Sequence, residues 1–295
     1  MLRIATVNVN GIRAAWRKGM GPWIEEADAD VVTLQEVRAA NDIALTMFGD
    51  IEGYAAYSAD STEAKGRAGV AVLARGASGA GAAGAGEGAV PAGAQAVATR
   101  VGIGDEYFDA AGRWIETDFE LADGSLLTVV SAYVHSGDMK RASDPISEKQ
   151  ADKYRFLDRM VERLPEIRAH ADHAVVTGDM NVCHTERDIK NAKSNKWSSG
   201  FLIPEREYFD RFFGELGWVD VHRQLNGDVD GPYTWWSMRG KAFDTDAGWR
   251  IDYQMATPEL AAAAKASRVD RAPDYASRWS DHAPLVIDYD VPGLK

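Results

Sequence analysis

The sequence predicts an α/β or α+β protein in which large sheets are covered by helices. Eight short apolar runs alternate with segments of helical periodicity along the 295 residues. Several of these runs are apolar almost throughout, which is typical of strands that are buried on both faces. A hydrophobic content of 45% provides enough side chains for a sizeable core. Length alone is compatible with one large domain or with two modest ones.

The predicted strands are short runs rich in Val, Ile and Leu. In chain order they cover residues 2–9, 30–35, 68–74, 113–121, 126–134, 173–179, 251–257 and 284–291. The run HAVVTGD at 173–179 is followed by Met180 and Asn181. Side chains two residues apart on an extended segment point to the same side, so Asp179 and Asn181 are expected to face the same object.

The clearest helix prediction covers residues 147–164. Ser147 followed by Gln150 is the pattern of a capping box. Apolar residues then recur at helical spacing, namely Tyr154, Leu157, Val161 and Leu164. Further helices are predicted at 21–28, 38–48 and 204–216.

The segment 76–95 is almost entirely Gly and Ala. Such a composition buries too little apolar surface to offset the entropy lost on ordering, so a long surface loop is predicted between two strands. A domain boundary is the alternative interpretation. We favour one domain over residues 1–295, because the polar motifs described below lie on both sides of this segment.

The formal net charge of −12, taken alone, argues against a polyanionic partner. Basic residues nevertheless cluster at 13–19, 190–196 and 238–243. Each cluster could be ordinary solvated surface. If all three lie on one face, binding of a polyanion stays possible, because a site acts through its local field.

The chain shows no sign of a membrane or secretory protein. No apolar run approaches the length of a membrane span, and the N-terminus lacks a basic region followed by an apolar run. Cys183 is the single cysteine, so no intrachain disulfide can form. We expect a cytoplasmic protein without a membrane partner.

Five polar clusters follow or end predicted strands, and a sixth lies near the C-terminus. They are TVNVNG (6–11), TLQEVR (33–38), SAYVHSGD (131–138), TGDMN (177–181), RIDYQ (250–254) and WSDHAP (279–284). Together they supply many oxygen donors and one imidazole, on Asn8, Asn10, Glu36, Tyr133, Asp179, Asn181, Asp252, Asp281 and His282.

Oxygen donors of this kind suit hard cations, Mg²⁺ above all, with Mn²⁺ as a possible substitute. Phosphodiester hydrolysis requires a polarised phosphoryl oxygen, a deprotonated water and a stabilised leaving alkoxide. A metal on Glu36, a water at Asp179 and Asn181, and His282 near the phosphoryl oxygens would meet these requirements. Asp281 or another carboxylate could orient and charge His282. Each residue alone could instead be a turn residue, a helix cap or a member of a structural pair.

Several segments, taken together and in order, resemble the exonuclease III / abasic (AP) endonuclease family of the endonuclease–exonuclease–phosphatase superfamily. They are NVNGIRA, LQEVR, GDMNVCHTERDIKN, YTWWSMRGKAFDTDAGWRIDY and SDHAP, and they extend from residue 8 to residue 284. The resemblance implies a four-layer α/β sandwich. In this fold two mixed β-sheets pack face to face and helices lie on the outside.

The resemblance also implies a metal site. Glu36 would be the main metal carboxylate, with Asn8 and Asn10 beside it. Asp252 and Asp281 would contribute to the metal or to its surroundings.

For the catalytic residues, the resemblance implies that Asp179 positions or deprotonates the attacking water and that Asn181 holds this water or the phosphate. His282 would bind the scissile phosphate, backed by Asp281. Tyr133 would contact the phosphate or assist the leaving group.

The substrate implied by the resemblance is double-stranded DNA with abasic sites or 3′ ends, handled by a monomer. Trp235, Trp249 and Ile251 fall where the family builds an apolar pocket for a flipped-out, base-less sugar, although YTWW could also be plain core packing. Arg239 falls where a family member inserts a side chain into DNA. Arg38 keeps the positive charge of a position where lysine is common.

The chain departs from the family pattern Tyr-x-Pro-Asn, because His135 and Ser136 stand in place of the last two residues. Ser136 can still donate one hydrogen bond but reaches less far than asparagine, which bears on phosphate affinity. Two alternatives remain: a phosphoesterase for RNA or a small phosphorylated substrate, and a non-catalytic DNA-binding relative. The aromatic segment and DIKN at 188–191 favour DNA repair.

Overall fold

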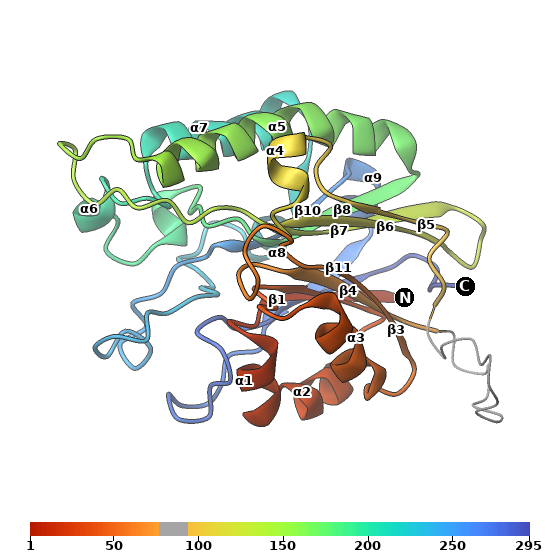
Figure 1. Ribbon diagram of the computed structural model, residues 1–295. Coiled ribbons are helices and arrows are strands. Elements are labelled where there is room, and N and C mark those ends of the chain that lie inside the picture. The colour runs from red at the N-terminus through yellow and green to blue at the C-terminus, as the bar shows by residue number, and fades with distance from the viewer. Residues whose placement is uncertain (77–93) are drawn as a thin grey trace.

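The protein is described by a computed structural model that covers residues 1–76 and 94–295 (Figure 1). Two mixed six-stranded sheets pack face to face, with helices on both outer surfaces. The predicted four-layer α/β sandwich is confirmed. Most of the predicted Gly/Ala loop at 76–95 lies outside the described residues.

The first sheet has the strand order β11-β12-β1-β2-β4-β3. Its strands are β1 (Leu2–Asn8), β2 (Val31–Gln35), β3 (Tyr54–Ala59), β4 (Val70–Arg75), β11 (Ala264–Val269) and β12 (Leu285–Tyr289). The central strands β1 and β2 are parallel, and the other pairs in this sheet are antiparallel.

The second sheet has the strand order β5-β6-β7-β8-β10-β9. Its strands are β5 (Ala98–Val101), β6 (Trp114–Glu120), β7 (Leu126–Tyr133), β8 (His173–Asp179), β9 (Val219–Asp220) and β10 (Asp252–Ala256). Again only the central pair, β7 and β8, is parallel. Each sheet therefore has one parallel pair at its centre.

All eight predicted strands are present, and the four strands that the sequence did not reveal are β3, β5, β9 and β11. These are the edge strands of the two sheets. An edge strand is less buried than a central one, so its sequence need not be apolar. β11 (AKASRV) and β5 (ATRV), for example, consist of half-buried and exposed residues only.

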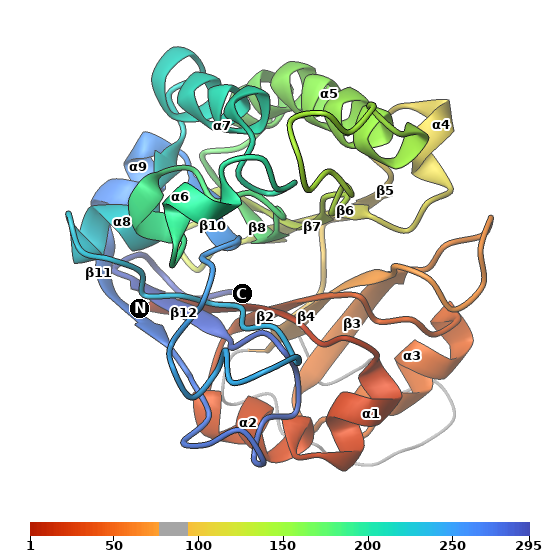
Figure 2. The ribbon, with the colours of Figure 1, turned by 90° about the vertical axis from the view of Figure 1, so that its left-hand side faces the viewer.

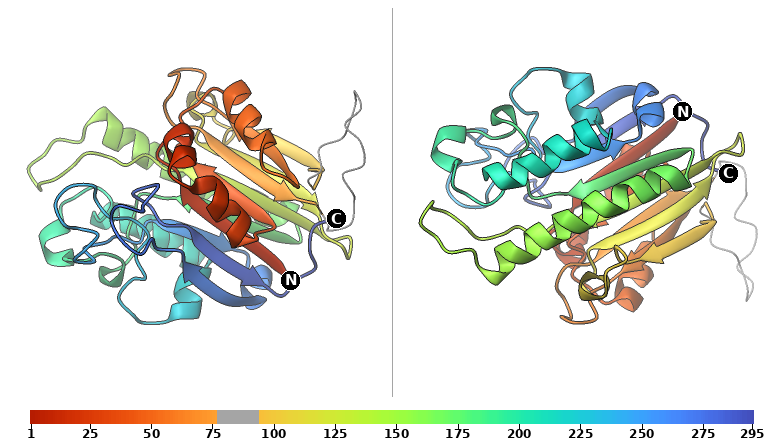
Figure 3. Two further views of the ribbon diagram at one scale, coloured as in Figure 1. Left: turned by 90° about the horizontal axis from the view of Figure 1, so that it is seen from below. Right: turned by 90° about the horizontal axis from the view of Figure 1, so that it is seen from above.

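Three helices cover the outer face of the first sheet: α1 (Ile12–Arg17), α2 (Met20–Ala27) and α3 (Asn41–Gly49). The outer face of the second sheet is covered by α4 (Glu106–Asp109), α5 (Glu148–His170) and α7 (Ile203–Asp210), the last continued by a π-helical turn at Arg211–Glu215. Figure 3 shows these two layers from opposite sides. Short elements complete the chain: η1 (Glu186–Asp188), α6 (Ala192–Asn195), α8 (Val221–Asn226) and α9 (Pro258–Ala262).

The predicted helices are present, with α5 longer than expected. It continues beyond residue 164 through Pro165 to His170. Its N-terminus forms half of the expected capping box, because the Ser147 hydroxyl accepts from the Gln150 backbone N–H (3.1 Å). The Gln150 side chain does not return to Ser147 and donates instead to Glu205 (3.0 Å).

The central strands carry apolar residues at consecutive positions because their two faces contribute to different cores. Ile4 of β1 and Val175 of β8 lie in the core between the sheets. Val7 of β1 packs in the core beneath α1 and α2, and Val176 of β8 packs in the core beneath α5. Among the described residues, no helix combines the length and apolarity needed to cross a bilayer.

Candidate active site

The carboxyl ends of both parallel strand pairs meet at one end of the sandwich. Asn8 ends β1, Glu36 directly follows β2, and Tyr133 and Asp179 end β7 and β8. Parallel neighbours place their carboxyl ends at the same edge, and the two sheets face each other there. A pocket of about 330 Å³ opens at this end, lined by Asn8, Asn10, Glu36, Arg38, Tyr133, Ser136, Asp179, Asn181, Ser199, Trp235, Trp249, Ile251, Asp281 and His282.

Nearly every residue predicted for the site therefore lies around one pocket. Two do not line it. Asp252 is fully buried and lies behind His282. Arg239 is exposed in the loop after Trp236, so the structure does not place it in the pocket. Ser199 lines the pocket but was not predicted, because nothing in SSG distinguishes a site serine from a turn serine.

Near the end of β8, the backbone at Gly178 adopts a conformation that requires glycine. Its φ of 129° is unfavourable for other residues, and a Cβ there would collide with the carbonyl oxygen of Ala132 on the neighbouring strand. The turn that follows brings Asn181 back onto Asp179. The Asn181 backbone N–H donates to Asp179 Oδ1 (2.9 Å), and its amide donates to Asp179 Oδ2 (3.2 Å). The two side chains therefore lie together because of this turn, whereas the expectation was based on alternation along an extended segment.

Left-handed backbone conformations are concentrated at this pocket. Of the eight non-glycine residues with positive φ in the described chain, four line it: Asn10, Glu36, Arg38 and Asn181. Such conformations cost about 1–3 kcal/mol each and persist only where surrounding contacts impose them. The site is therefore held by its scaffold in a geometry that these local sequences would not choose alone.

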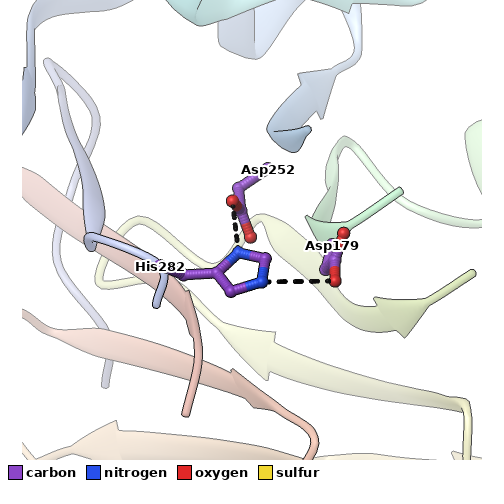
Figure 4. Close-up of side chains that lie close together, drawn as sticks. All are labelled: Asp179, Asp252 and His282. Carbon is purple, nitrogen blue, oxygen red and sulfur yellow. Dashed lines mark hydrogen bonds and ion pairs between the residues drawn. The ribbon is translucent and has the colours of Figure 1, made fainter. Parts of the chain in front are cut away.

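His282 lies between two carboxylates (Figure 4). Its Nδ1 is 2.9 Å from Asp252 Oδ2, and its Nε2 is 3.8 Å from Asp179 Oδ2. The expectation that Asp281 backs His282 is wrong. Asp281 lies in the bend before His282 and accepts instead from Asn10 Nδ2 (2.8 Å) and Trp235 Nε1 (3.0 Å).

Burial and charge shift the protonation of this centre. Burial by itself would lower the pKa of His282, but Asp252 and Asp179 outweigh it and raise the pKa to about 10. Burial raises the pKa of the Asp179 carboxyl to about 7, with Asp252 adding to the effect and His282 opposing it. The pocket thus contains an imidazolium beside a carboxyl group that can accept a proton near neutral pH.

Glu36 is contacted by two other site residues. Its Oε1 accepts from the Tyr133 hydroxyl, and its Oε2 pairs with Arg38 (2.9 Å). Behind Tyr133, the Arg113 guanidinium lies 4.6 Å from the ring centroid and donates to the Tyr133 carbonyl (3.2 Å). No sequence pattern singles out Arg113, which merely begins a predicted strand. Burial raises the pKa of Tyr133 well above its usual range, so its phenol stays neutral.

The oxygen donors around Glu36 fit a hard cation. Asn10 donates to Asp281 through Nδ2, which leaves its Oδ1 as a potential ligand. Asn8 connects the two halves of the site, since its Oδ1 accepts from the Asn10 backbone N–H (2.9 Å) and its Nδ2 donates to Asp179 (2.9 Å). A second group, Asp179, Asp252 and His282, has ligand atoms within 4.8 Å of one another.

The apolar wall of the pocket is formed by Trp235, Trp249 and Ile251. The two indole rings meet edge to face, with centroids 5.7 Å apart. Their backbones pair with each other, and Trp235 also pairs with His282. Ile251, which is 4% exposed, packs with both rings in a small cluster beside Cys183. The wall is thereby attached directly to the charged centre.

His135, one of the departures from the family pattern, packs into the core beside α5. Its ring centroid is 5.7 Å from that of Phe108 and 5.6 Å from that of Phe156. Its Nδ1 is buried without a hydrogen-bond partner. Burial lowers the pKa of His135 to about 3. Ser136, in contrast, lines the pocket.

We expect His135 to make the fold acid-sensitive. Its pKa in the folded state lies below the unfolded value of about 6.5, so the unfolded chain takes up a proton first as the pH falls. The free energy of unfolding should then decrease by about 1–2 kcal/mol between pH 7 and pH 5 through this residue. In His135→Phe, denaturant titrations at the two pH values should show a correspondingly smaller difference. Equal differences in the two proteins would contradict this expectation.

The fold and the pocket define a class of protein. The Endonuclease/Exonuclease/phosphatase family model matches residues 5–282, and the chain belongs to this family. Nucleases of this family are metal-dependent, and the acidic cluster described above could bind a metal ion.

Within the family, the chain is similar to DNA nucleases. The exodeoxyribonuclease of Bacillus subtilis (strain 168) is 30% identical over 287 residues, which cover 97% of this chain and 98% of that protein. The DNA-(apurinic or apyrimidinic site) endonuclease of Dictyostelium discoideum is 29% identical, over 98% of this chain and 71% of that one. The structure of an AP endonuclease from Archaeoglobus fulgidus superposes with a TM-score of 0.80 at 29% identity, covering 99% of this chain and 100% of that one. The predicted resemblance is confirmed.

Proposed function

We propose that this nuclease is a Mg²⁺-dependent phosphodiesterase of DNA repair, which incises duplex DNA 5′ to abasic sites and removes nucleotides from 3′ ends. One observation carries the proposal. Glu36, Asp179, Asn181 and His282 come from distant segments of the chain and line one pocket, whose other wall is built from indole rings.

The polar residues match the steps of phosphodiester hydrolysis. A cation held by Glu36, with oxygens of Asn10 and Asp281 nearby, would supply polarisation of a phosphoryl oxygen and stabilisation of the leaving alkoxide. Asp179 accepts a proton from the attacking water, because burial keeps its pKa near neutral pH. The His282 imidazolium offsets negative charge on the phosphoryl oxygens.

The apolar wall suits a sugar that has no base. A deoxyribose without a base offers no base edge for hydrogen bonds, so selection depends on shape and apolar contact. Trp235 is fixed in place by its hydrogen bond to Asp281, and Trp249 by its backbone pairing with Trp235. A rigid wall can exclude a full nucleotide.

Local charge supports a polyanionic substrate despite the net charge of −12. Figure 2 shows α1, α6 and the loop after Trp236, which carry or adjoin the three basic clusters, at one end of the molecule. A second hollow of about 800 Å³ has three basic residues on its wall, Arg187, Lys190 and Lys193, against two acidic ones, Glu186 and Asp230. It adjoins the pocket, because Ile189 on its wall pairs with Trp249. We infer that duplex DNA extends from the pocket across this surface.

The proposal is tested with a duplex that carries one tetrahydrofuran residue, an analogue of an abasic site. We expect incision 5′ to this residue with Mg²⁺ or Mn²⁺, and none in EDTA. An undamaged duplex with blocked 3′ ends is the control and should stay intact. Turnover of RNA or an inositol phosphate, without incision of the DNA, would indicate a different phosphoesterase. Tight binding of the duplex without cleavage would indicate a non-catalytic DNA-binding protein. We also infer that the protein is a monomer, which light scattering would test. We infer a cytoplasmic location, which cell fractionation would test.

A further inference from the structure

A fully buried ion pair lies beneath the pocket, outside the residues assigned above. Lys153 on α5 and Glu205 on α7 both have side chains that are 0% exposed, and Lys153 Nζ is 2.7 Å from Glu205 Oε1. Burying two charges often costs more than burying apolar side chains of similar volume, so stability alone does not account for this pair. The other contacts of Lys153 and Glu205 indicate the role of this pair.

Lys153 also contacts the turn that carries Asn181. Its ammonium donates to the Asn181 backbone carbonyl at 2.9 Å. Asn181 has a φ of 51°, a conformation that its neighbours must enforce. Its amide donates to Asp179 and to the Val134 carbonyl (2.9 Å), and its carbonyl is held by Lys153. The ammonium therefore fixes the side of the turn that faces away from the pocket.

Glu205 holds the loop that forms the adjacent part of the pocket. Its carboxylate accepts from the backbone N–H groups of Gly200 (2.6 Å) and Leu202 (3.1 Å). Gly200 lies so close to the Trp249 ring that a Cβ there would be 2.8 Å from it. The same loop contributes Ser199, whose hydroxyl donates to Gln150 of α5 (2.5 Å). One ion pair thus connects the Asn181 turn to the loop behind the indole wall.

We propose that Lys153 is a positioning residue. Its buried ammonium, balanced by Glu205, holds the Asn181 turn in the left-handed conformation that aims the Asn181 amide at Asp179, the residue assigned to the attacking water. Lys153 does not line the pocket, so its direct contact with a pocket residue is the hydrogen bond from its ammonium to the Asn181 carbonyl. The rate measurements that test this inference assume the proposed function, incision at abasic sites.

The first test is Lys153→Met, which keeps the approximate length of the side chain and removes its charge. We expect kcat for incision of the tetrahydrofuran duplex to fall by about 30- to 100-fold, because small misplacements of reacting groups are costly, with KM changed by less than about 3-fold. Lys153→Met leaves the Glu205 carboxylate buried without its partner. The second variant therefore combines Lys153→Met with Glu205→Gln, and we expect it to be more stable than Lys153→Met alone. It should recover thermal stability but not kcat. Full recovery of kcat in the double variant would overturn the proposal.

The matched control is Arg163→Met, also on α5. Arg163 pairs with the buried Glu116 (2.7 Å), and neither residue lines the pocket or contacts Asn181. This variant should lose stability while kcat stays within about 2-fold of wild type at a temperature where both proteins are folded. Equal losses of kcat in the two variants would show a general effect of weakening α5 and would overturn the proposal.

A double-mutant cycle tests whether the effect passes through Asn181. If it does, adding Lys153→Met to Asn181→Ala should change kcat by less than about 3-fold, because coupled residues are not additive. Independent, multiplicative losses would overturn the proposal. A crystal structure of Lys153→Met gives a readout that does not depend on activity: the Asn181 turn should leave its left-handed conformation. An unchanged turn would overturn the proposal, whereas failure of wild type to cut abasic DNA would count only against the proposed function.

Discussion

Replacing Asp179 with asparagine should lower the single-turnover rate of incision at an abasic analogue by about 10³-fold, within the range observed when a general base is removed. The amide cannot accept the proton of the attacking water. In wild type the deprotonated form of Asp179 is required, and its pKa is raised to about 7, so the rate should fall as the pH drops below about 7. This decrease in rate on the acid side of the pH–rate profile, the acid limb, should disappear in Asp179→Asn.

Asp118→Asn is the control for removal of a buried carboxylate. Asp118 lies in β6, paired with Thr128 toward the start of β7 and therefore away from the pocket end of that strand. It bonds Arg100 and His170, so its replacement should lower stability and leave the rate of the folded enzyme unchanged. A similar rate in Asp179→Asn and wild type, or an acid limb that persists in the variant, would contradict the assigned role of Asp179.

Replacing Asp252 with asparagine should lower kcat by about 10²-fold and shift the alkaline limb of the pH–rate profile to lower pH. His282 must stay protonated to offset charge on the phosphate, and Asp252 is the largest contributor that raises its pKa to about 10. Without this carboxylate, the imidazolium loses its proton at a lower pH. The measurement is kcat between about pH 6 and about pH 11, a range that brackets this titration.

Asp281→Asn is the matched comparison, since Asp281 is adjacent to His282 in sequence but does not bond it. Asp281 bonds Asn10 and Trp235, so its replacement should raise KM or the Mg²⁺ requirement and move the alkaline limb less. The reverse order, with Asp281→Asn moving the alkaline limb more than Asp252→Asn, would show that the sequence-based pairing was correct.

Most of the fold could be predicted because the central strands are buried on both faces. β1, β2, β7 and β8 carry apolar residues at consecutive positions, and this pattern is evident without knowledge of the tertiary structure. The four edge strands were missed, since pairing on one side only places little constraint on composition. β9, for example, has only two residues, Val219 and Asp220.

The residues of the site were predictable from their positions at strand ends, but their partners were not. Asp281 was assigned to His282 because it is adjacent in sequence, whereas the actual partner, Asp252, is 30 positions away. Adjacency does not fix where a side chain points in the bend at 279–281, and the Asp281 carboxylate bonds Asn10 and Trp235 instead.

The sequence contains one indication of the role of Lys153, namely its position on the buried face of α5. The stripe that α5 buries runs through Gln150, Lys153, Leu157, Met160 and Leu164, and a lysine on this stripe is the unusual feature. The sequence prediction had instead included Tyr154 and Val161, both only partly buried. A charged residue at an otherwise buried helical position indicates a buried partner, although the sequence does not identify that partner as Glu205.

The most direct measurement is the position of Mn²⁺, located by anomalous scattering in crystals of the protein with a duplex that carries one tetrahydrofuran residue. We predict one Mn²⁺ between the Glu36 carboxylate and the phosphate 5′ to the abasic residue, with that phosphate also contacting Asn181 and His282. A phosphate seated elsewhere, for instance at Lys190 and Lys193, with no cation at Glu36, would contradict the claim that the pocket residues act together on one phosphodiester.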